Sequence, residues 1–148
     1  MKKAKFSSVD ELREFIGNNG FDEVKFCVNP DYVDAVIGIS DEGKVVYDHE
    51  KMVDHLARLY EQEENCEDPY TDALEWIGFN CDVPYWEIVT PVDDWWPGIT
   101  TDIPNVSEYA IGVNQYGTLL VDSEKATEND IKTIMEFIDK DGVNLVVI

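Results

Sequence analysis

Basic residues are the scarcest component of this sequence. Its 148 residues include 11 Lys and Arg against 32 Asp and Glu, which gives a net charge of −21 at pH 7. Between Leu59 and Glu124 there is no Lys or Arg, although fifteen of the acidic residues lie in that span. Phosphate backbones would repel such a chain, so we expect no direct binding of nucleic acid. An acidic surface that only keeps the protein dissolved would give the same composition.

Long apolar runs and paired cysteines are missing as well. No run reaches the roughly 18 apolar residues of a membrane-spanning helix, and the basic start of the chain lacks the apolar core of a secretory signal. Cys27, Cys66 and Cys81 are odd in number and show no CxxC spacing. This argues for a reducing compartment and against a disulfide framework or a zinc site. We therefore expect a cytoplasmic protein that does not contact membranes.

The sequence also lacks the motifs of known catalytic and cofactor sites. It contains no GxGxxG, Walker, GxSxG or HExxH pattern, and its only histidines are His49 and His55. A negative field raises the pKa of a thiol, which disfavours a cysteine nucleophile. We therefore expect no enzyme activity, no cofactor and no dedicated metal site.

The strongest positive signal is an internal repeat. The stretch VIGISDEGKVVYDHEK, at 36–51, recurs 74 positions later as AIGVNQYGTLLVDSEK, at 110–125, with both glycines in register. Each copy has two apolar runs around a glycine-containing turn, which predicts a β-hairpin. The aspartate that follows, Asp48 or Asp122, suits a strand exit or a helix cap. We interpret the stretches as two copies of one ββα unit; the alternative is two unrelated hairpins with similar turn chemistry.

Hydrophobic spacing and breakers predict the remaining elements. Helices are expected at 9–19, 50–64, 69–79 and 127–140. Strands are expected at 21–28, 34–40, 44–47 and 85–90, with the second hairpin at 107–121. The proline-rich stretch 91–104 is expected to be irregular, with a loop at 93–98. The terminal stretch 143–148 is nearly all apolar, which is typical of an inner strand.

Together these elements predict one α+β domain over 1–148. Its sheet would be rich in antiparallel pairs and built from two repeated ββα units, with pseudo-repeats at 35–64 and 109–140 and helices packed on one face. The apolar content of 44% and the aromatic content of 11% support a packed core.

Two stretches are candidates for binding a protein partner. On a helix, carboxylates three or four residues apart lie about 5–6 Å from each other, a density comparable to that of duplex DNA, which carries one charge per about 1.7 Å. The candidate acids are Glu61, Glu64, Glu67, Asp68, Asp72 and Glu75. The second candidate is the run Asp93, Asp94, Trp95 and Trp96, where an exposed Trp beside acids would anchor a basic protein. Alternatively, both rings cover the core under a long loop.

The stretch from Ala35 to Tyr85 carries a series of short motifs. It reads AVIG at 35–38, G-x-VVYD at 43–48, KM at 51–52, EWIGFN at 75–80 and PY at 84–85. This series resembles a group of short uncharacterised proteins from Firmicutes genomes and mobile elements. The resemblance covers about a third of the chain. It implies a small αβ fold and a bacterial or phage cytoplasmic setting, and it brings no established activity.

The acidity is similar to that of phage anti-CRISPR and anti-restriction proteins that mimic nucleic acid. We therefore expect an acidic inhibitor that occupies the nucleic-acid-binding surface of a basic host defence protein or another nucleic-acid-handling protein. The alternative is a non-mimic interaction module, of the toxin-immunity or adaptor type, that binds through its aromatic loop. A continuous acidic face would favour the first hypothesis, whereas acids scattered around a neutral aromatic patch would favour the second.

Overall fold

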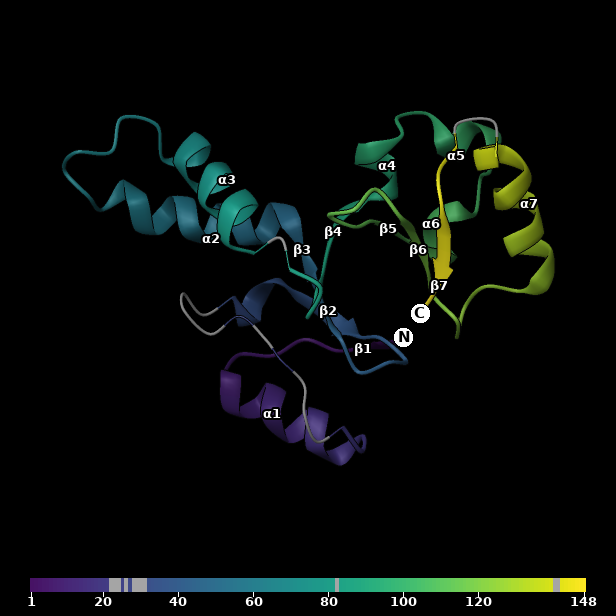
Figure 1. The fold of residues 1–148 in the computed structure, drawn as a ribbon, viewed down its shortest axis with the longest axis horizontal. Coiled ribbons are helices and arrows are strands. Elements are labelled where there is room, and N and C mark those ends of the chain that lie inside the picture. Colours follow the sequence, from purple (N-terminus) through teal and green to yellow (C-terminus); the bar gives the residue numbers. More distant parts are fainter. Residues whose placement is uncertain (22–24, 26, 28–31, 82, 140–141) are drawn as a thin grey trace.

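The computed structural model describes residues 1–21, 25, 27, 32–81, 83–139 and 142–148. Within these residues the fold is α+β, with seven α-helices and a mixed sheet of seven strands (Figure 1). The strands are β1 (Lys2–Lys3), β2 (Val36–Ile39), β3 (Val45–Asp48), β4 (Glu87–Pro91), β5 (Ala110–Val113), β6 (Leu119–Val121) and β7 (Leu145–Val147). The helices are α1 (Val9–Asn18), α2 (His49–Glu61), α3 (Pro69–Asn80), α4 (Val92–Trp95), α5 (Ile99–Asp102), α6 (Val106–Tyr109) and α7 (Glu128–Ile138), with a 3₁₀ turn, η1, at Val33–Ala35.

The strands lie in the sheet in the same order as in the chain. Neighbours pair antiparallel except for β3 with β4 and β6 with β7, which pair parallel. A parallel pair needs a crossover connection, and helices α2 and α3 supply the first and α7 the second. The two edges of the sheet meet at the termini, where the α-amino group of Met1 donates to the Ile148 carbonyl at 2.8 Å (Figure 1).

Both predicted hairpins are present, and their registers correspond. Gly38 lies opposite Val46 in the first, and Gly112 lies opposite Leu120 in the second. Each hairpin has a register shift just before this glycine. A Cβ on Gly38 would collide with the Lys2 carbonyl oxygen, and one on Gly112 would collide with that of Thr90. Glycine is therefore required in both copies because a neighbouring strand passes too close for a side chain.

Side-chain caps precede three of the helices. Asp48, Asp68 and Thr127 each accept a hydrogen bond from the backbone N–H three residues later, at 3.1 to 3.3 Å. Such a bond satisfies one of the amides that a helix start leaves without a partner. These caps fix the starts of α2, α3 and α7.

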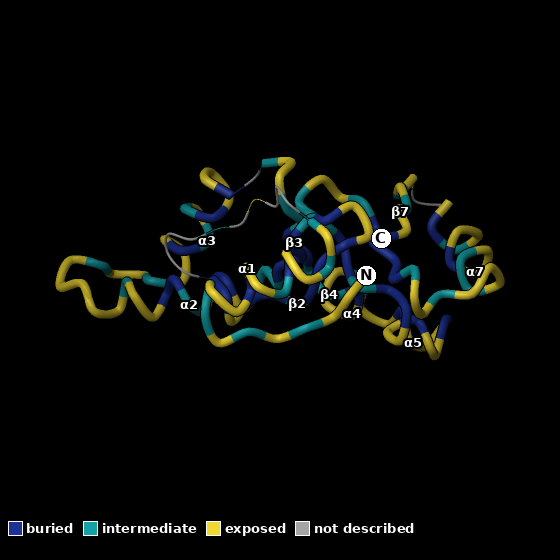
Figure 2. The backbone as a smooth tube through the Cα atoms, turned by 90° about the horizontal axis from the view of Figure 1, so that it is seen from below, coloured by how far each residue is buried: buried dark blue, intermediate teal, exposed yellow. Residues whose placement is uncertain are grey.

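The sheet divides the interior into three apolar clusters. One lies between α1, α2, α3 and strands β2 to β4, and a second lies between α4 to α7 and strands β5 and β6. Because alternate residues of a strand point to opposite faces, Val46 and Leu120 instead join Met1, Val89 and Ile148 in a third cluster on the other face. Figure 2 shows the buried strands along the centre of the molecule, with exposed backbone at both ends.

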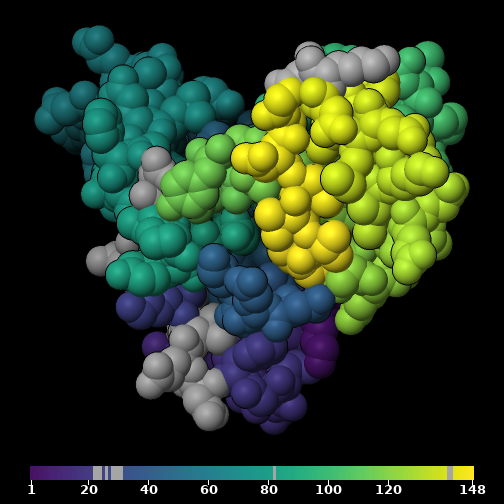
Figure 3. Space-filling model, turned by 45° about the vertical axis from the view of Figure 1, so that its right-hand side comes forward, coloured from purple at the N-terminus to yellow at the C-terminus, as the bar shows by residue number. Residues whose placement is uncertain are grey.

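We refer to residues 1–86 as the first lobe and to 92–148 as the second. Strand β4 joins them, since it pairs with β3 on one side and with β5 on the other. The space-filling view shows the two lobes rising on either side of a notch (Figure 3).

The structure corrects two predictions from sequence. The stretch 91–104, expected to be irregular with a loop at 93–98, contains α4 and α5, and α6 precedes a second hairpin that begins at 110 rather than 107. These single turns lie between Pro91, Gly98 and Pro104, and they bury apolar residues such as Ile99. Stretches this short carry no helical periodicity, so the pattern did not reveal them.

The terminal strand β7 is at the end of the sheet order rather than inside it. Val146 and Val147 are 46% and 44% exposed, while Leu145 and Ile148 pack into the second and third clusters. Apolar composition alone did not distinguish an inner strand from an edge strand.

The predicted strand at 21–28 lies largely outside the described residues. Within the part of the chain described, no helix combines the length and the apolar character needed to cross a membrane.

Candidate functional site

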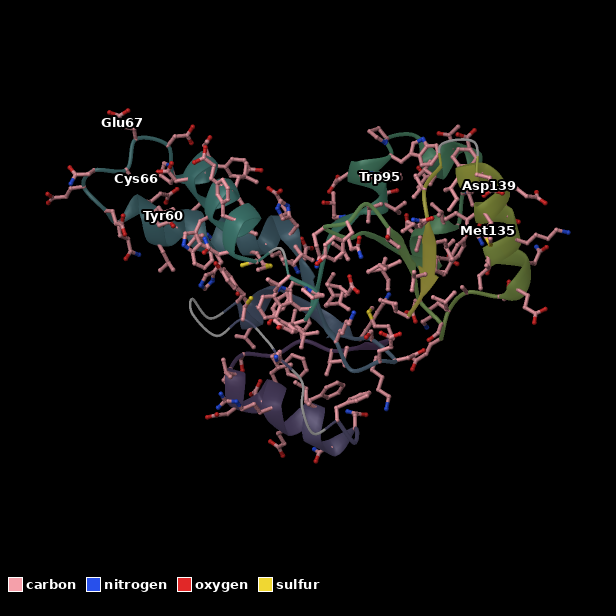
Figure 4. All side chains as sticks on the ribbon, in the orientation of Figure 1. Tyr60, Cys66, Glu67, Trp95, Met135 and Asp139 are labelled. Atoms are coloured by element: carbon pink, nitrogen blue, oxygen red, sulfur yellow. The ribbon has the colours of Figure 1, made fainter. Side chains whose placement is uncertain are left out.

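The six predicted acids of the first lobe gather at one end of the molecule. Helices α2 and α3 pack against each other and are joined by the loop 62–68, which forms the far end of the lobe in Figure 4, where Tyr60, Cys66 and Glu67 are labelled. We call residues 60–80 the acidic tip. All six predicted acids on it are exposed: Glu61, Glu64, Glu67, Asp68, Asp72 and Glu75.

A hollow of about 450 Å³ lies in the acidic tip, between the end of α2 and one side of α3. Its walls combine three aromatic rings with three carboxylates and small polar groups: Tyr60, Trp76 and Phe79; Glu63, Asp72 and Glu75; Asn65, Cys66 and Asn80. The sequence pattern did not reveal the hollow. Four of its lining residues are nevertheless spaced three or four apart, which places them on one face of a helix: Asp72, Glu75, Trp76 and Phe79.

Hydrogen bonds restrain one acid of the tip. Both oxygens of Asp68 are engaged, because Oδ1 accepts from the Thr71 backbone N–H at 3.2 Å and Oδ2 accepts from the Thr71 hydroxyl at 2.7 Å. These bonds hold the pKa of Asp68 below its usual value. Asp68 is therefore ionised at neutral pH, but its first role is to cap α3.

The negative field of the tip acts on neighbouring neutral groups. The Cys66 thiol donates to Asp72 Oδ2 at 3.1 Å, and this bond raises the pKa of Cys66 to about 11. Burial and then the charges of Glu63 and Asp72 raise the pKa of Tyr60. Each shift has the sign expected for an excess of carboxylates, which disfavours any further negative charge.

The aromatic candidates lie on the second lobe, away from the tip (Figure 4). Trp95 is 37% exposed, whereas Trp96 is half-buried and packs on Phe137 with ring centroids 4.6 Å apart. The rings of Trp95 and Trp96 meet edge to face at 5.5 Å. Asp93 and Asp94 beside them are exposed, and Asp93 accepts a hydrogen bond from the Ser107 hydroxyl. The structure therefore does not join the acid cluster and the tryptophans into one surface.

A smaller hollow of about 220 Å³ lies where the lobes meet, with His49, Ile88, Thr90 and Val113 among its lining residues. The turn of the second hairpin closes it. Gln115 Oε1 accepts from the Ile88 N–H at 3.0 Å, and its Nε2 donates to the Val83 and Trp86 carbonyls. These bonds hold the turn against β4 and the residues that precede it.

A buried ion pair joins the N-terminus to the residue that follows β6. The Met1 α-amino group lies 3.2 Å from Asp122 Oδ1, and both groups are at most 1% exposed. The Asp122 carboxylate also accepts from the Glu124 N–H at 3.0 Å. Asp48, its counterpart in the first hairpin, is only half-buried. The repeat predicted the position of Asp122, but not this partner from the other end of the chain.

Two thiols of the first lobe interact directly. Cys27 and Cys81 share a hydrogen bond that raises the pKa of Cys27 and lowers that of Cys81. Both belong to or border the first apolar cluster, and the three cysteines of the chain are free. Cys81 is buried and Cys27 is half-buried.

The described residues contain no group of three or more His, Cys, Asp or Glu side chains arranged to hold a metal ion. No protein-family model matches this chain, and neither the curated proteins nor the solved structures contain a significant match to it.

Proposed function

We propose that this protein is an acidic inhibitor that occupies the nucleic-acid-binding surface of a basic protein, as anti-CRISPR and anti-restriction mimics do. One observation carries the proposal: six exposed acids gather on the acidic tip, in a part of the sequence without a Lys or Arg. We place it in a bacterial or phage cytoplasmic setting, without enzyme activity. Its partner would be a host defence protein or another protein that handles nucleic acid.

Charge density is the physical reason for this choice. A groove that binds DNA is basic and suits about one negative charge per 1.7 Å of duplex axis. Two packed helix ends and a short loop present the carboxylates of the tip. Their summed field steers a basic partner towards the tip.

An interaction module of the toxin-immunity or adaptor type is the second candidate. It is favoured by Trp95, whose exposed ring rests on Trp96 beside Asp93 and Asp94. An exposed Trp on a rigid base is a common anchor in protein interfaces. In this case the shape of the second lobe would determine binding, and the charge of the tip would matter little.

Identification of the partner and a competition assay test the proposal. The full chain is used to capture proteins from a bacterial host lysate, and mass spectrometry identifies them. The purified partner is then titrated with its DNA or RNA in the presence of this protein, at about 0.05 M and 0.2 M salt. We expect competition that weakens steeply with salt, because charge pairing carries the binding.

Two variants separate the candidates. The first changes Glu61, Glu64 and Glu67 to Lys and keeps Asp68, because Asp68 caps α3. The second changes Trp95 to Ala and keeps Trp96, because Trp96 packs on Phe137. If the charge variant competes normally while the Trp95→Ala variant does not, the mimic proposal is wrong and the interaction module takes its place.

We also propose that the two ββα units are copies of one unit, with their helices on the same face of the sheet. Support comes from corresponding registers and from Val45 and Leu119, which occupy equivalent positions and face the helical clusters. In an experimentally determined structure, the backbones of 36–51 and 110–125 should superpose. Different strand pairing in the two copies would contradict the proposal.

A further inference from the structure

The hollow in the acidic tip has features that a charged surface alone does not need. Three aromatic residues line it, and one of them, Phe79, is 87% exposed. Trp76 is half-buried against the first apolar cluster, so its ring is held in place. Carboxylates of Glu63, Asp72 and Glu75 stand among these rings. The hollow thus offers flat apolar faces and negative charge to the same occupant.

We infer that this hollow binds the guanidinium group of an arginine side chain from the partner protein. The inference rests on the proposed function for the identity of the partner as a basic protein. A cation over an aromatic face is attracted by the ring quadrupole, and a carboxylate beside it adds charge-assisted hydrogen bonds. Arginines in DNA-binding grooves form bidentate hydrogen bonds with phosphates and can form them with carboxylates as well. The carboxylates of the hollow would thus bind one arginine of the partner in place of a phosphate.

The chemistry of the walls favours arginine over other occupants. An anion would be repelled by the carboxylates, and an apolar side chain would remove them from water without compensation. Lysine would satisfy the charge, but its ammonium is a compact, strongly hydrated group without a flat face. Guanidinium is planar and weakly hydrated, so it can lie against Trp76 or Phe79 while its edge donates to Asp72 or Glu75.

No positive charge of the protein's own fills the hollow. All its lining residues are described, and none of them is Lys, Arg or His. The neighbouring groups carry pKa shifts of the sign that carboxylates produce, as at Cys66 and Tyr60. Among the described residues, Glu63, Asp72 and Glu75 form no ion pair, so an incoming cation meets carboxylates that are not already neutralised.

Peptide titration of the full chain tests the inference. The probe is the blocked peptide Gly-Gly-Arg-Gly-Gly, compared with the same peptide carrying Lys or citrulline in place of Arg. Two-dimensional NMR of the ¹⁵N-labelled protein reports binding through the indole N–H of Trp76 and the amides of residues 60–66 and 72–80. We expect saturable shifts with Arg, weaker binding with Lys and none with citrulline, which is flat but uncharged.

Two variants locate the contact. Phe79→Ala removes a ring that is almost fully exposed, and we expect it to weaken Arg binding about two- to fivefold. Its matched control is Tyr116→Ala, which removes an exposed ring from the turn of the second hairpin. Glu75→Gln should weaken binding by a similar factor, whereas Glu136→Gln on α7 should not. An unchanged melting temperature in all four variants confirms that each still folds.

Equal binding of the Arg and Lys peptides, with no effect of Phe79→Ala, would overturn the inference. In that case the tip attracts cations only through its overall field, and competition with nucleic acid would still occur. The proposed mimicry can also fail while the inference about the hollow holds. Arg binding in the hollow without competition for the partner's nucleic-acid site would support the hollow and contradict the proposed mimicry.

Discussion

Single residues already separate the two hairpins. Asp48 and Asp122 occupy equivalent positions in the sequence pattern, but Asp48 is the last residue of β3, whereas Asp122 directly follows β6. The first caps α2, while the second lies 1% exposed against the α-amino group of Met1. A buried charge that loses its partner is far more costly than a lost helix cap, so the same substitution should have different effects at the two sites.

We therefore predict that Asp122→Asn lowers the free energy of unfolding by about 3 kcal/mol, because it removes the buried partner of the Met1 ammonium and leaves only the exposed Asp41 carboxylate as its counter-charge. The matched variant Asp48→Asn should cost about 1 kcal/mol or less, since Asn also caps helices well. Urea denaturation followed by circular dichroism measures both values. Equal losses would show that the Met1 contact adds no stability.

The thiol of Cys66 reports the charge of the tip. Its pKa of about 11 leaves about one molecule in a thousand as thiolate at pH 8. Its alkylation by iodoacetamide should therefore rise about tenfold per pH unit up to pH 11. Asp72→Ala removes the accepting carboxylate and lowers this pKa, so alkylation at pH 8 should accelerate several-fold.

Peptide mass spectrometry assigns the modification to Cys66, apart from the thiols of Cys27 and Cys81. Asp94→Ala, on the second lobe, is the control and should leave the rate unchanged. If Asp72→Ala also leaves it unchanged, the thiol is not bonded to Asp72 in solution.

At the scale of elements, sequence predicted those that carry their own signals. Turn glycines and apolar runs located both hairpins, and hydrophobic spacing located α2, α3 and α7. The two-residue strand β1 carries no pattern, because it exists only through its pairing with β2. The edge position of β7 and the single turns α4 to α6 likewise depend on tertiary contacts.

In the candidate site, too, some features could be predicted from the sequence and others depend on tertiary packing. Exposure of the acids followed from their charge. Their predicted helical spacing was wrong for Glu64 and Glu67, because α2 ends at Glu61 and both lie on the loop 62–68. The hollow required the packing of α2 against α3, which brings Tyr60 opposite Trp76. Separation of Trp95 from the tip is a property of the two-lobed sheet, and no local pattern encodes it.

The cap of α3 gives a prediction for this element. Because hydrogen bonds from Thr71 depress the pKa of Asp68, its stabilising effect is present above the unfolded pKa, about 3.9, and is lost as the pH falls through the lower folded value. Asp68→Ala should lower the free energy of unfolding at pH 7. The difference from the wild type should disappear towards pH 2 in urea titrations. A difference independent of pH would exclude the ionised cap as its cause.

For the whole molecule, the balance of charge sets the response to salt. With a net charge of −21, like charges repel across the surface, and the Debye length falls to about 3 Å at 1 M salt. We therefore predict that the melting temperature rises from low salt to about 0.5 M NaCl. The buried pair of Met1 and Asp122 lies outside this effect, because salt screens buried charges little.

A variant with Glu108, Glu124 and Glu136 changed to Lys tests the cause, since these three exposed acids lie outside the tip. Its net charge is −15, so its melting temperature should rise less with salt. If the melting temperature of the wild type stays constant or falls as salt is added, the acids are already well separated or locally paired.

The association rate with the captured partner tests the central claim most directly. Stopped-flow measurements compare the tip variant, with Glu61, Glu64 and Glu67 changed to Lys, with the variant changed at Glu108, Glu124 and Glu136. Both carry the same net charge, so only the position of the change differs. We predict that at low salt the tip variant associates about tenfold or more slowly than the wild type, whereas the second variant slows much less. Equal slowing by both variants, or normal association of the tip variant, would contradict the claim that the acidic tip takes the place of nucleic acid.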